Sequence, residues 1–116
     1  MTKIYFLPKD QIQRLVSGYG AGLASDMITV DGLPVCFMYR EGPRHDHDSG
    51  WCFMSGQETD EYANDIENLA YYNINTIVNY DRSIIPLLDA PIGSAFERNS
   101  GDEDFVEILD WNSTED

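Results

Sequence analysis

Apolar residues recur at helical spacing in three parts of the chain, which predicts three short helices. The first lies between Pro8 and Gly18, where apolar residues at i, i+3 and i+4 share one face. The second begins at Thr59, a residue type that caps helices. The third covers residues 73–80, where asparagines alternate with apolar residues and leave a strand as the alternative. The predicted inward-facing residues are Ile12, Leu15, Val16, Tyr62, Ile66, Leu69, Ala70, Ile74, Ile77 and Val78.

Shorter apolar runs between turn residues predict the strands of a sheet. The clearest pair, Asp26–Val30 and Leu33–Arg40, is separated by Asp31-Gly32, two residues that favour a tight hairpin turn. Alternation gives the second of these strands two faces, one of which is formed by Val35, Phe37 and Tyr39. The other predicted strands are Lys3–Phe6, Gly50–Met54, Ser94–Arg98 and Phe105–Leu109.

Together these elements predict an α+β fold, with a mainly antiparallel sheet of about five or six short strands and two or three short helices. The chain has 116 residues, of which 42% are hydrophobic, and this is enough for one domain with its own core. We therefore expect a single domain over residues 1–110, followed by an acidic tail at residues 111–116 that frays from it.

The sequence also bears on where the protein acts. It has no apolar stretch long enough to cross a membrane, and its N-terminus lacks the apolar core of a secretory signal. The two cysteines, Cys36 and Cys52, do not suggest a disulfide framework. These features favour a soluble cytoplasmic protein, and no cofactor is expected.

Acidic residues outnumber basic ones by 21 to 7, which gives a formal net charge of −14. Most of this charge lies in residues 41–67 and 97–116, which each hold eight acidic residues and one basic residue. Such a surface disfavours binding to nucleic acid or to an anionic membrane. It favours a basic protein partner, because complementary potentials speed the encounter, although an acidic surface can also serve solubility alone.

The segment HDSGWCFMSGQ, residues 47–57, holds a tryptophan and a phenylalanine between two glycines. Strand alternation places Trp51 and Phe53 on one face of the sheet. One interpretation packs both rings in the core. The other leaves Trp51 partly exposed as an aromatic anchor with an acidic rim, an arrangement suited to a cationic surface. The candidate rim residues are Asp46, Asp48, Glu58, Asp60, Glu61 and Tyr62.

Patterns typical of catalysis or metal binding are weak. GYGAG at residues 18–22 lacks the strand–turn–helix setting and the lysine of a phosphate loop. No serine lies in a nucleophile elbow, and acidic surroundings disfavour a cysteine thiolate, so we do not expect an enzyme. The cysteine and histidine side chains that could bind a metal allow two interpretations. In one, the two cysteines are buried and the two histidines are exposed. The alternative is a tetrahedral zinc site, although its spacing is unusual, formed by Cys36, His45, His47 and Cys52.

Four segments, in order along residues 4–108, resemble the immunity protein thirty-three family. They are GYGAGLASDMITVDGLPVCFMYREGP, DSGWCFMSGQETDEY, NINTIVNYDRSIIPLLDAPIGSAFER and DFVEI. The resemblance implies a small intracellular bacterial α+β protein that neutralises a toxin of a polymorphic toxin system. The residues that match the family's pattern around the tryptophan are Gly50, Trp51, Phe53, Gly56, Glu58, Glu61 and Tyr62.

Two functions fit these observations. The first is a non-catalytic inhibitor that binds a basic toxin domain through an acidic, aromatic-anchored surface, and it rests on the resemblance and the charge. The second is a small binding or housekeeping module with a metabolite or peptide pocket near Trp51 and Tyr62. We favour the first.

Overall fold

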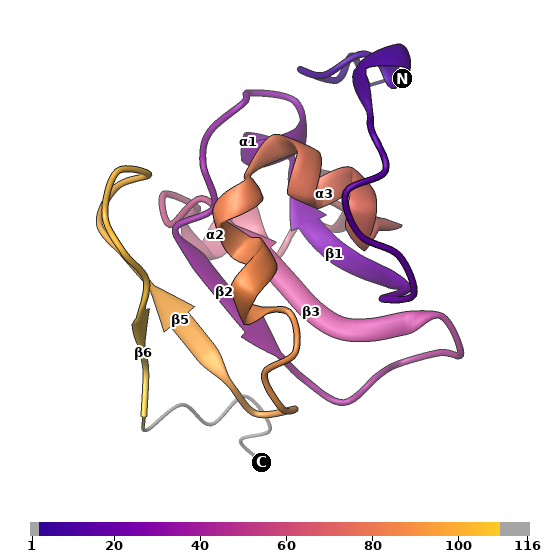
Figure 1. Cartoon of the computed structure of the whole chain (residues 1–116). Helices are drawn as coiled ribbons and strands as arrows, with labels where there is room; N and C mark the ends of the chain where they lie inside the picture. The colour runs from indigo at the N-terminus through magenta and orange to yellow at the C-terminus, as the bar shows by residue number, and fades with distance from the viewer. Residues whose placement is uncertain (1–2, 110–116) are drawn as a thin grey trace.

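The computed structural model describes residues 3–109, which build a six-stranded sheet in the order β4-β1-β3-β2-β5-β6 (Figure 1). β1 and β3 are parallel, and every other neighbouring pair is antiparallel. The strands are β1 (Ala21–Ser25), β2 (Phe37–Arg40), β3 (Asp48–Met54), β4 (Leu69–Asn73), β5 (Ala95–Glu97) and β6 (Val106–Glu107). The helices are α1 (Asp26–Thr29), α2 (Asp60–Ala63) and α3 (Ile74–Tyr80), with 3₁₀ turns η1 (Lys9–Gln11), η2 (Ile66–Asn68) and η3 (Arg82–Leu87).

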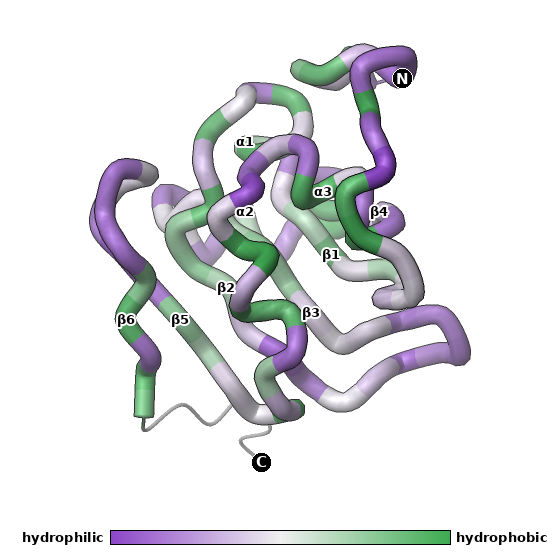
Figure 2. The backbone as a smooth tube through the Cα atoms, in the orientation of Figure 1, coloured by the Kyte–Doolittle hydropathy of each residue, from purple (hydrophilic) through white to green (hydrophobic). Residues whose placement is uncertain are grey.

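One face of the sheet, called the inner face here, packs against α1, α3 and η3 and forms the core (Figures 1 and 2). Strand alternation turns Met38 of β2 and both Trp51 and Phe53 of β3 to this side. Burying a side chain of this size stabilises the fold by about 1.5–3 kcal/mol. The helices and turns contribute the opposing residues Ile28, Ile74, Ile77, Val78, Ile84 and Leu88.

Several predicted elements are confirmed, and with them a single compact α+β domain. α3 forms where residues 73–80 predicted a helix, and its residues Ile74, Ile77 and Val78 are buried as expected. Asn73 caps it, since its side chain accepts a hydrogen bond from the amide of Asn75 at 2.8 Å. The predicted strands Ser94–Arg98 and Phe105–Leu109 are present in shorter form as β5 and β6, which pair antiparallel. The tail expected at residues 111–116 lies outside the described residues.

The helix predicted between Pro8 and Gly18 is wrong. Only the three residues of η1 are helical there, and the segment that follows runs along α3. Two asparagines of α3 hold that segment: Asn75 accepts from the amide of Leu15 at 2.7 Å, and Asn79 accepts from the amide of Gln13 at 2.9 Å. Because side chains from another element satisfy its backbone, this segment does not need helical hydrogen bonds.

The hairpin predicted around Asp31-Gly32 is also wrong, because the residues before the turn form α1. The hydroxyl of Ser25 caps this helix by accepting a hydrogen bond from the amide of Met27 at 3.0 Å. Gly32 ends it with φ of 80°, and the amide of Leu33 donates back to the carbonyl of Met27 at 2.9 Å. A glycine with positive φ suits a helix end as well as a hairpin, so the local signal was ambiguous.

The second predicted helix is confirmed only at its start. The hydroxyl of Thr59 accepts a hydrogen bond from the amide of Tyr62 at 3.1 Å and caps α2. After four residues the helix ends, and Leu69 and Ala70 belong to β4, which pairs with β1 along five residues. Ile66, expected on the buried face, is 84% exposed. Pairing with β1 therefore outweighs helical periodicity in this segment.

The N-terminal half differs from prediction in two more ways. Lys3–Phe6 is not a strand; Lys3 instead forms an ion pair with Asp26 at 2.8 Å. The amide of Phe6 also donates to the carbonyl of Thr29 at 2.8 Å, so the segment is tied to α1. β1 begins within the glycine-rich segment GYGAG and was not among the predicted strands.

Candidate protein-binding cleft

The face of the sheet opposite the core, called the outer face here, carries aromatic and apolar side chains from β2 and β3. Strand pairing sets Tyr39 against Cys52 and Phe37 against Met54, and alternation turns all four away from the core. The rings of Phe37 and Tyr39 stack with their centroids 5.5 Å apart and their planes at 25°. The outer face therefore holds a preformed aromatic platform.

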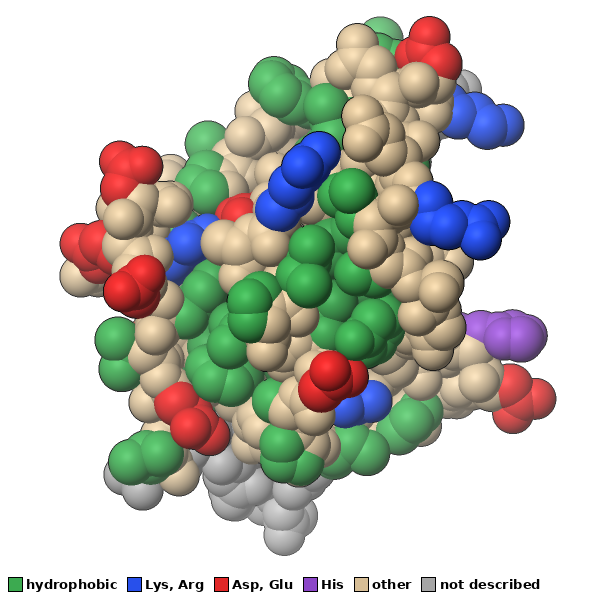
Figure 3. All heavy atoms as spheres, viewed as in Figure 1, with side chains coloured by type: hydrophobic (Ala, Val, Ile, Leu, Met, Phe, Trp, Pro, Cys, Tyr) green, Lys and Arg blue, Asp and Glu red, His purple; other side chains and the backbone are tan. Residues whose placement is uncertain are grey.

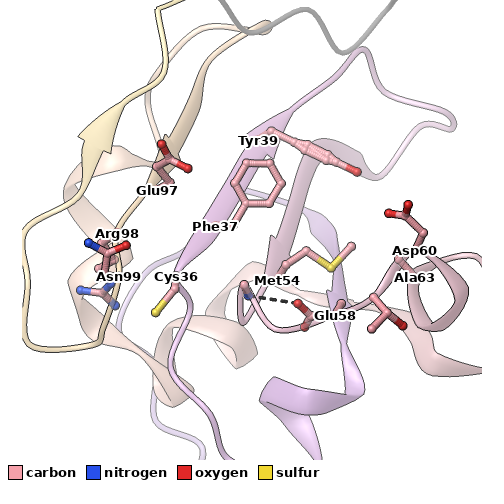
Figure 4. Close-up of a pocket in the computed structure, with 12 residues that line it drawn as sticks. Cys36, Phe37, Tyr39, Met54, Glu58, Asp60, Ala63, Glu97, Arg98 and Asn99 are labelled. Carbon is pink, nitrogen blue, oxygen red and sulfur yellow. Dashed lines mark hydrogen bonds between the residues drawn. The ribbon is translucent and has the colours of Figure 1, made fainter.

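A cleft of about 550 Å³ lies over this platform, between α2 and the end of β5 (Figure 4). Its floor is formed by the aromatic pair and Met54. One wall comes from the segment 58–63, and the other from residues 97–99. Figure 4 shows Asp60 on one side of the platform and Glu97 on the other. Sheet and helix thus bring together residues that lie far apart in the sequence.

Glu58 supplies a fixed negative charge to the wall beside α2. Its Oε2 accepts hydrogen bonds from the amide and the hydroxyl of Ser55, both at 2.9 Å, and its Oε1 accepts from the amide of Gly56 at 3.0 Å. Partial burial alone would raise the pKa of Glu58, but hydrogen bonds from Ser25 and Ser55 outweigh burial and lower that pKa. The carboxylate is therefore ionised at neutral pH.

Asp60 and Glu97 are the lining carboxylates that are accessible to a partner. Both side chains are exposed, and neither has a hydrogen bond or ion pair with another residue in the described range 3–109. Glu97 lies beside the floor because it pairs with Phe37 across β5 and β2. The two walls can therefore each contribute one acceptor to a bound cation.

Arg98 is a cation in the lining, and its charge is already used by the fold. Its side chain is only 2% exposed and forms an ion pair with Asp81 at 2.7 Å. Its Nε also donates to the carbonyl of Val35 at 2.9 Å, and its guanidinium lies over the ring of Phe105 at 4.1 Å. The cleft therefore presents net negative charge.

The floor of the cleft is uncharged at neutral pH. The buried Cys52 pairs with Tyr39 across β2 and β3 but does not line the cleft, and burial raises the pKa of its thiol to about 11. Burial, with a smaller effect from Cys52, also raises the pKa of Tyr39 well above its ordinary value of 10.0. Because both groups keep their protons, the negative charge of the site comes from its walls.

Residues 22–109, which include every residue of the cleft lining, match a family model, that of the Imm33 immunity protein domain. The chain belongs to the Imm33 immunity protein family. Membership implies neutralisation of a cognate toxin protein, and immunity proteins generally act without catalysis. Neither a curated protein nor a solved structure matches the chain significantly.

In this Imm33 domain the aromatic residues that the sequence suggested as an anchor lie in the core. Trp51 is 1% exposed, its ring stacks on Phe53 with centroids 6.1 Å apart, and its Nε1 donates to the carbonyl of Leu88 at 3.1 Å. The core interpretation is confirmed, and the expected exposure of Trp51 is wrong. Trp51 does not line the cleft. The aromatic floor comes instead from Phe37 and Tyr39, which strand alternation had already placed together.

The structure gathers part of the predicted acidic rim on one side of the cleft. Glu58 and Asp60 line it, whereas Glu61 is exposed on α2 and Tyr62 is half-buried. Glu97 on the opposite wall was missed by the sequence reasoning, because its distance along the chain hid the pairing of β5 with β2. Its place in the predicted strand Ser94–Arg98 was the one available signal.

The other two candidate acids lie in the connection between β2 and β3. Asp48 is buried, and its side chain accepts hydrogen bonds from the amides of Arg44 and Gly50 at 2.9 and 2.8 Å. It therefore shapes the entry to β3. Asp46 is exposed in the preceding loop and does not line the cleft.

The zinc alternative is not assembled in the described part of this Imm33 domain. No three His, Cys, Asp or Glu side chains among residues 3–109 are grouped closely enough to hold a metal ion. Cys36 and Cys52 are free, buried thiols, and the ring of His45 packs edge-on against Tyr71 with centroids 5.0 Å apart. His47 is exposed.

Charge is distributed unevenly on the face of the molecule seen in Figure 3. Lys and Arg side chains lie over and beside α3 there, and a group of Asp and Glu side chains lies at the end of the sheet at β5 and β6. The loop between those strands carries Asp102, Glu103 and Asp104. Within residues 3–109 no helix has the length and apolar character needed to span a bilayer.

Proposed function

We propose that this Imm33 domain neutralises a basic toxin domain by binding it through the acid-walled cleft between α2 and β5. The observation that carries the proposal is the placement of Asp60 and Glu97 on opposite walls of a cleft with an aromatic floor. Aromatic rings bordered by carboxylates attract cations by the ring quadrupole and by direct charge. A preformed arrangement of this kind binds at a lower entropic cost than a flexible loop.

Neutralisation follows if the surface that the cleft contacts is the toxin's active site. A toxin that acts on a polyanionic substrate, such as a nuclease, carries basic residues around its catalytic centre. An acidic immunity protein can mimic the charge of that substrate and block the site without any chemistry of its own. Steering by complementary charge would also give rapid capture of the toxin.

The proposed place of this encounter is the cytoplasm. Cys36 and Cys52 are both free thiols in the structure. Stable disulfides are rare in the reducing cytosol, so two unpaired cysteines suit that compartment. A toxin that enters the cell would meet the inhibitor there.

Charge reversal tests the proposal. Asp60→Lys and Glu97→Lys each change the net charge by two units, as does the control Asp10→Lys on the remote turn η1. We expect each wall variant to weaken binding to the cognate toxin by at least roughly tenfold and to abolish rescue of growth, because like charges then face each other. The Asp10 variant should bind as the wild type does at matched ionic strength.

Binding is measured by surface plasmon resonance at low and physiological salt, with growth rescue by co-expression as the second readout. Wild-type affinity in both wall variants would refute the cleft as the interface. Equal losses in all three variants would show that net charge acts without a defined surface. A smaller salt dependence confined to the wall variants supports the proposal.

A further inference from the structure

The lining of the cleft favours a more specific partner group than a positive charge of any kind. Glu58 is half-buried in one wall and ionised at neutral pH, whereas Asp60 and Glu97 on the two walls are exposed. The cation in the lining, Arg98, is neutralised by Asp81. A partner group placed between the walls would therefore meet three carboxylates and no opposing free cation within the lining.

The floor adds a requirement of shape. The rings of Phe37 and Tyr39 stack on each other, with centroids 5.5 Å apart and planes at 25°, and lie between the two walls. A flat cation can lie parallel to an aromatic ring and present its edge to the carboxylates. The guanidinium of arginine is planar and carries donors around that edge, whereas the ammonium of lysine is a compact, strongly hydrated charge.

The size and lining of the cleft suit a long side chain with an apolar stem. About 550 Å³ lies within the range of pockets that hold small ligands. Met54, Ala63 and the buried Cys36 give part of the lining an apolar character. Long cationic side chains bury their methylene groups against such surfaces while the charged end reaches polar acceptors.

We propose that the cleft is an arginine pocket: it receives one arginine side chain of the partner, with the guanidinium over Phe37 and Tyr39 and between Asp60 and Glu97. This deepens the proposed function and rests on it, because the arginine is assigned to the basic surface of the toxin. A buried arginine at the centre of a contact is a common source of most of the binding energy.

A short peptide tests the pocket without the toxin. The full-length protein, labelled with ¹⁵N, is titrated with acetyl-Gly-Gly-Arg-Gly-Gly-amide while the backbone amide signals of the cleft are followed by NMR. Matched peptides carry lysine or citrulline, and citrulline keeps the shape of arginine without its charge. We expect saturable shifts at Phe37, Asp60 and Glu97, with arginine bound several-fold tighter than lysine and at least roughly tenfold tighter than citrulline.

Neutral, isosteric variants locate the effect. Asp60→Asn and Glu97→Gln should each weaken binding of the arginine peptide by roughly three- to tenfold and leave the citrulline peptide unaffected. Phe37→Leu should weaken binding of the arginine peptide more than binding of the lysine peptide, because it removes an aromatic ring that the planar guanidinium contacts. The control Asp10→Asn should change neither, and unchanged amide spectra away from the cleft show that each variant is folded.

Three results would overturn the arginine pocket: no saturation with the arginine peptide, equal affinity for arginine and citrulline, or lysine binding as tightly as arginine. These results are separable from failure of the proposed function. If charge reversal abolishes toxin binding and the peptide does not bind, the interface stands and the arginine pocket falls. If the peptide binds in the cleft and the toxin tolerates charge reversal, the cleft is a cation site outside the toxin interface.

Discussion

Replacing Glu58 with glutamine tests how the wall beside α2 is held in place. The carboxylate accepts three hydrogen bonds, two from Ser55 and one from Gly56. Glutamine keeps the shape of the side chain but exchanges one acceptor oxygen for an NH₂ donor. In Glu58→Gln the new NH₂ group therefore faces a hydrogen-bond donor of Ser55 or Gly56, and the remaining hydrogen bonds no longer involve a charged acceptor.

The magnitude follows from those contacts. A hydrogen bond to a charged group contributes about 1.5–3 kcal/mol to stability, and a neutral bond contributes about 1 kcal/mol. The variant loses at least one bond and converts the others from charged to neutral. Because Glu58 is only half-buried, solvent screens part of the difference. We expect the free energy of unfolding to fall by about 2 kcal/mol at pH 7.

The direction of the pKa shift sets the pH dependence of this effect. The pKa of Glu58 is lower in the folded protein than its ordinary value of 4.5. Its stabilising contribution is therefore complete above that value and is lost as the pH falls through the lower, folded-state pKa. The difference in unfolding free energy between wild type and variant should be largest at neutral pH and should shrink in acid.

Urea unfolding followed by circular dichroism at several pH values measures this difference. Glu61→Gln on α2 is the matched control, because it removes the same charge from an exposed residue and should change stability by less than about 0.5 kcal/mol. A Glu58 variant as stable as that control at pH 7 would refute the reasoning. So would a difference that persists unchanged well below the ordinary pKa of a glutamate.

Three further measurements probe other parts of the fold. Asn75→Ala should destabilise the protein by about 1–2 kcal/mol and speed amide exchange at Leu15, which loses its hydrogen-bond acceptor; hydrogen exchange by NMR checks this. Gly50→Ala should cost about 2–5 kcal/mol in urea unfolding, because φ is 91° and a Cβ would lie 1.9 Å from the carbonyl oxygen of Glu41. The Cys52 thiol, buried and with a pKa of about 11, should resist Ellman's reagent at pH 8 until the protein unfolds.

The fold was predictable where local and long-range forces agree. At α3, helical periodicity, a capping asparagine and burial against the sheet all favour the same structure. Before α3 they conflict: Leu15 and Val16 have helical spacing, yet Asn75 accepts hydrogen bonds from both amides and the segment is not helical. No local pattern could reveal that competition, because the asparagine lies about sixty residues away.

The candidate site was predictable in its chemistry more than in its position. Charge and an acidic segment after β3 indicated Glu58 and Asp60 as candidate rim residues, and both line the cleft. The choice of aromatic residues was wrong, because Trp51 and Phe37 belong to opposite faces of the same sheet. Strand alternation predicts which residues share a face of the sheet, but it does not predict which face the helices cover. The packing of α3 and η3 determines which face is buried.

The fold uses part of the basic charge in ion pairs and leaves acidic residues in excess at the surface. Lys3, Arg44 and Arg98 are engaged in ion pairs with acidic residues, so much of the basic charge stabilises local structure. The excess acidic residues remain at the surface, where their mutual repulsion disfavours the compact free protein. A cationic partner removes that repulsion when it binds, and its binding adds to the stability of the folded state. An acidic surface can thus weaken the free inhibitor and strengthen its complex through the same charges.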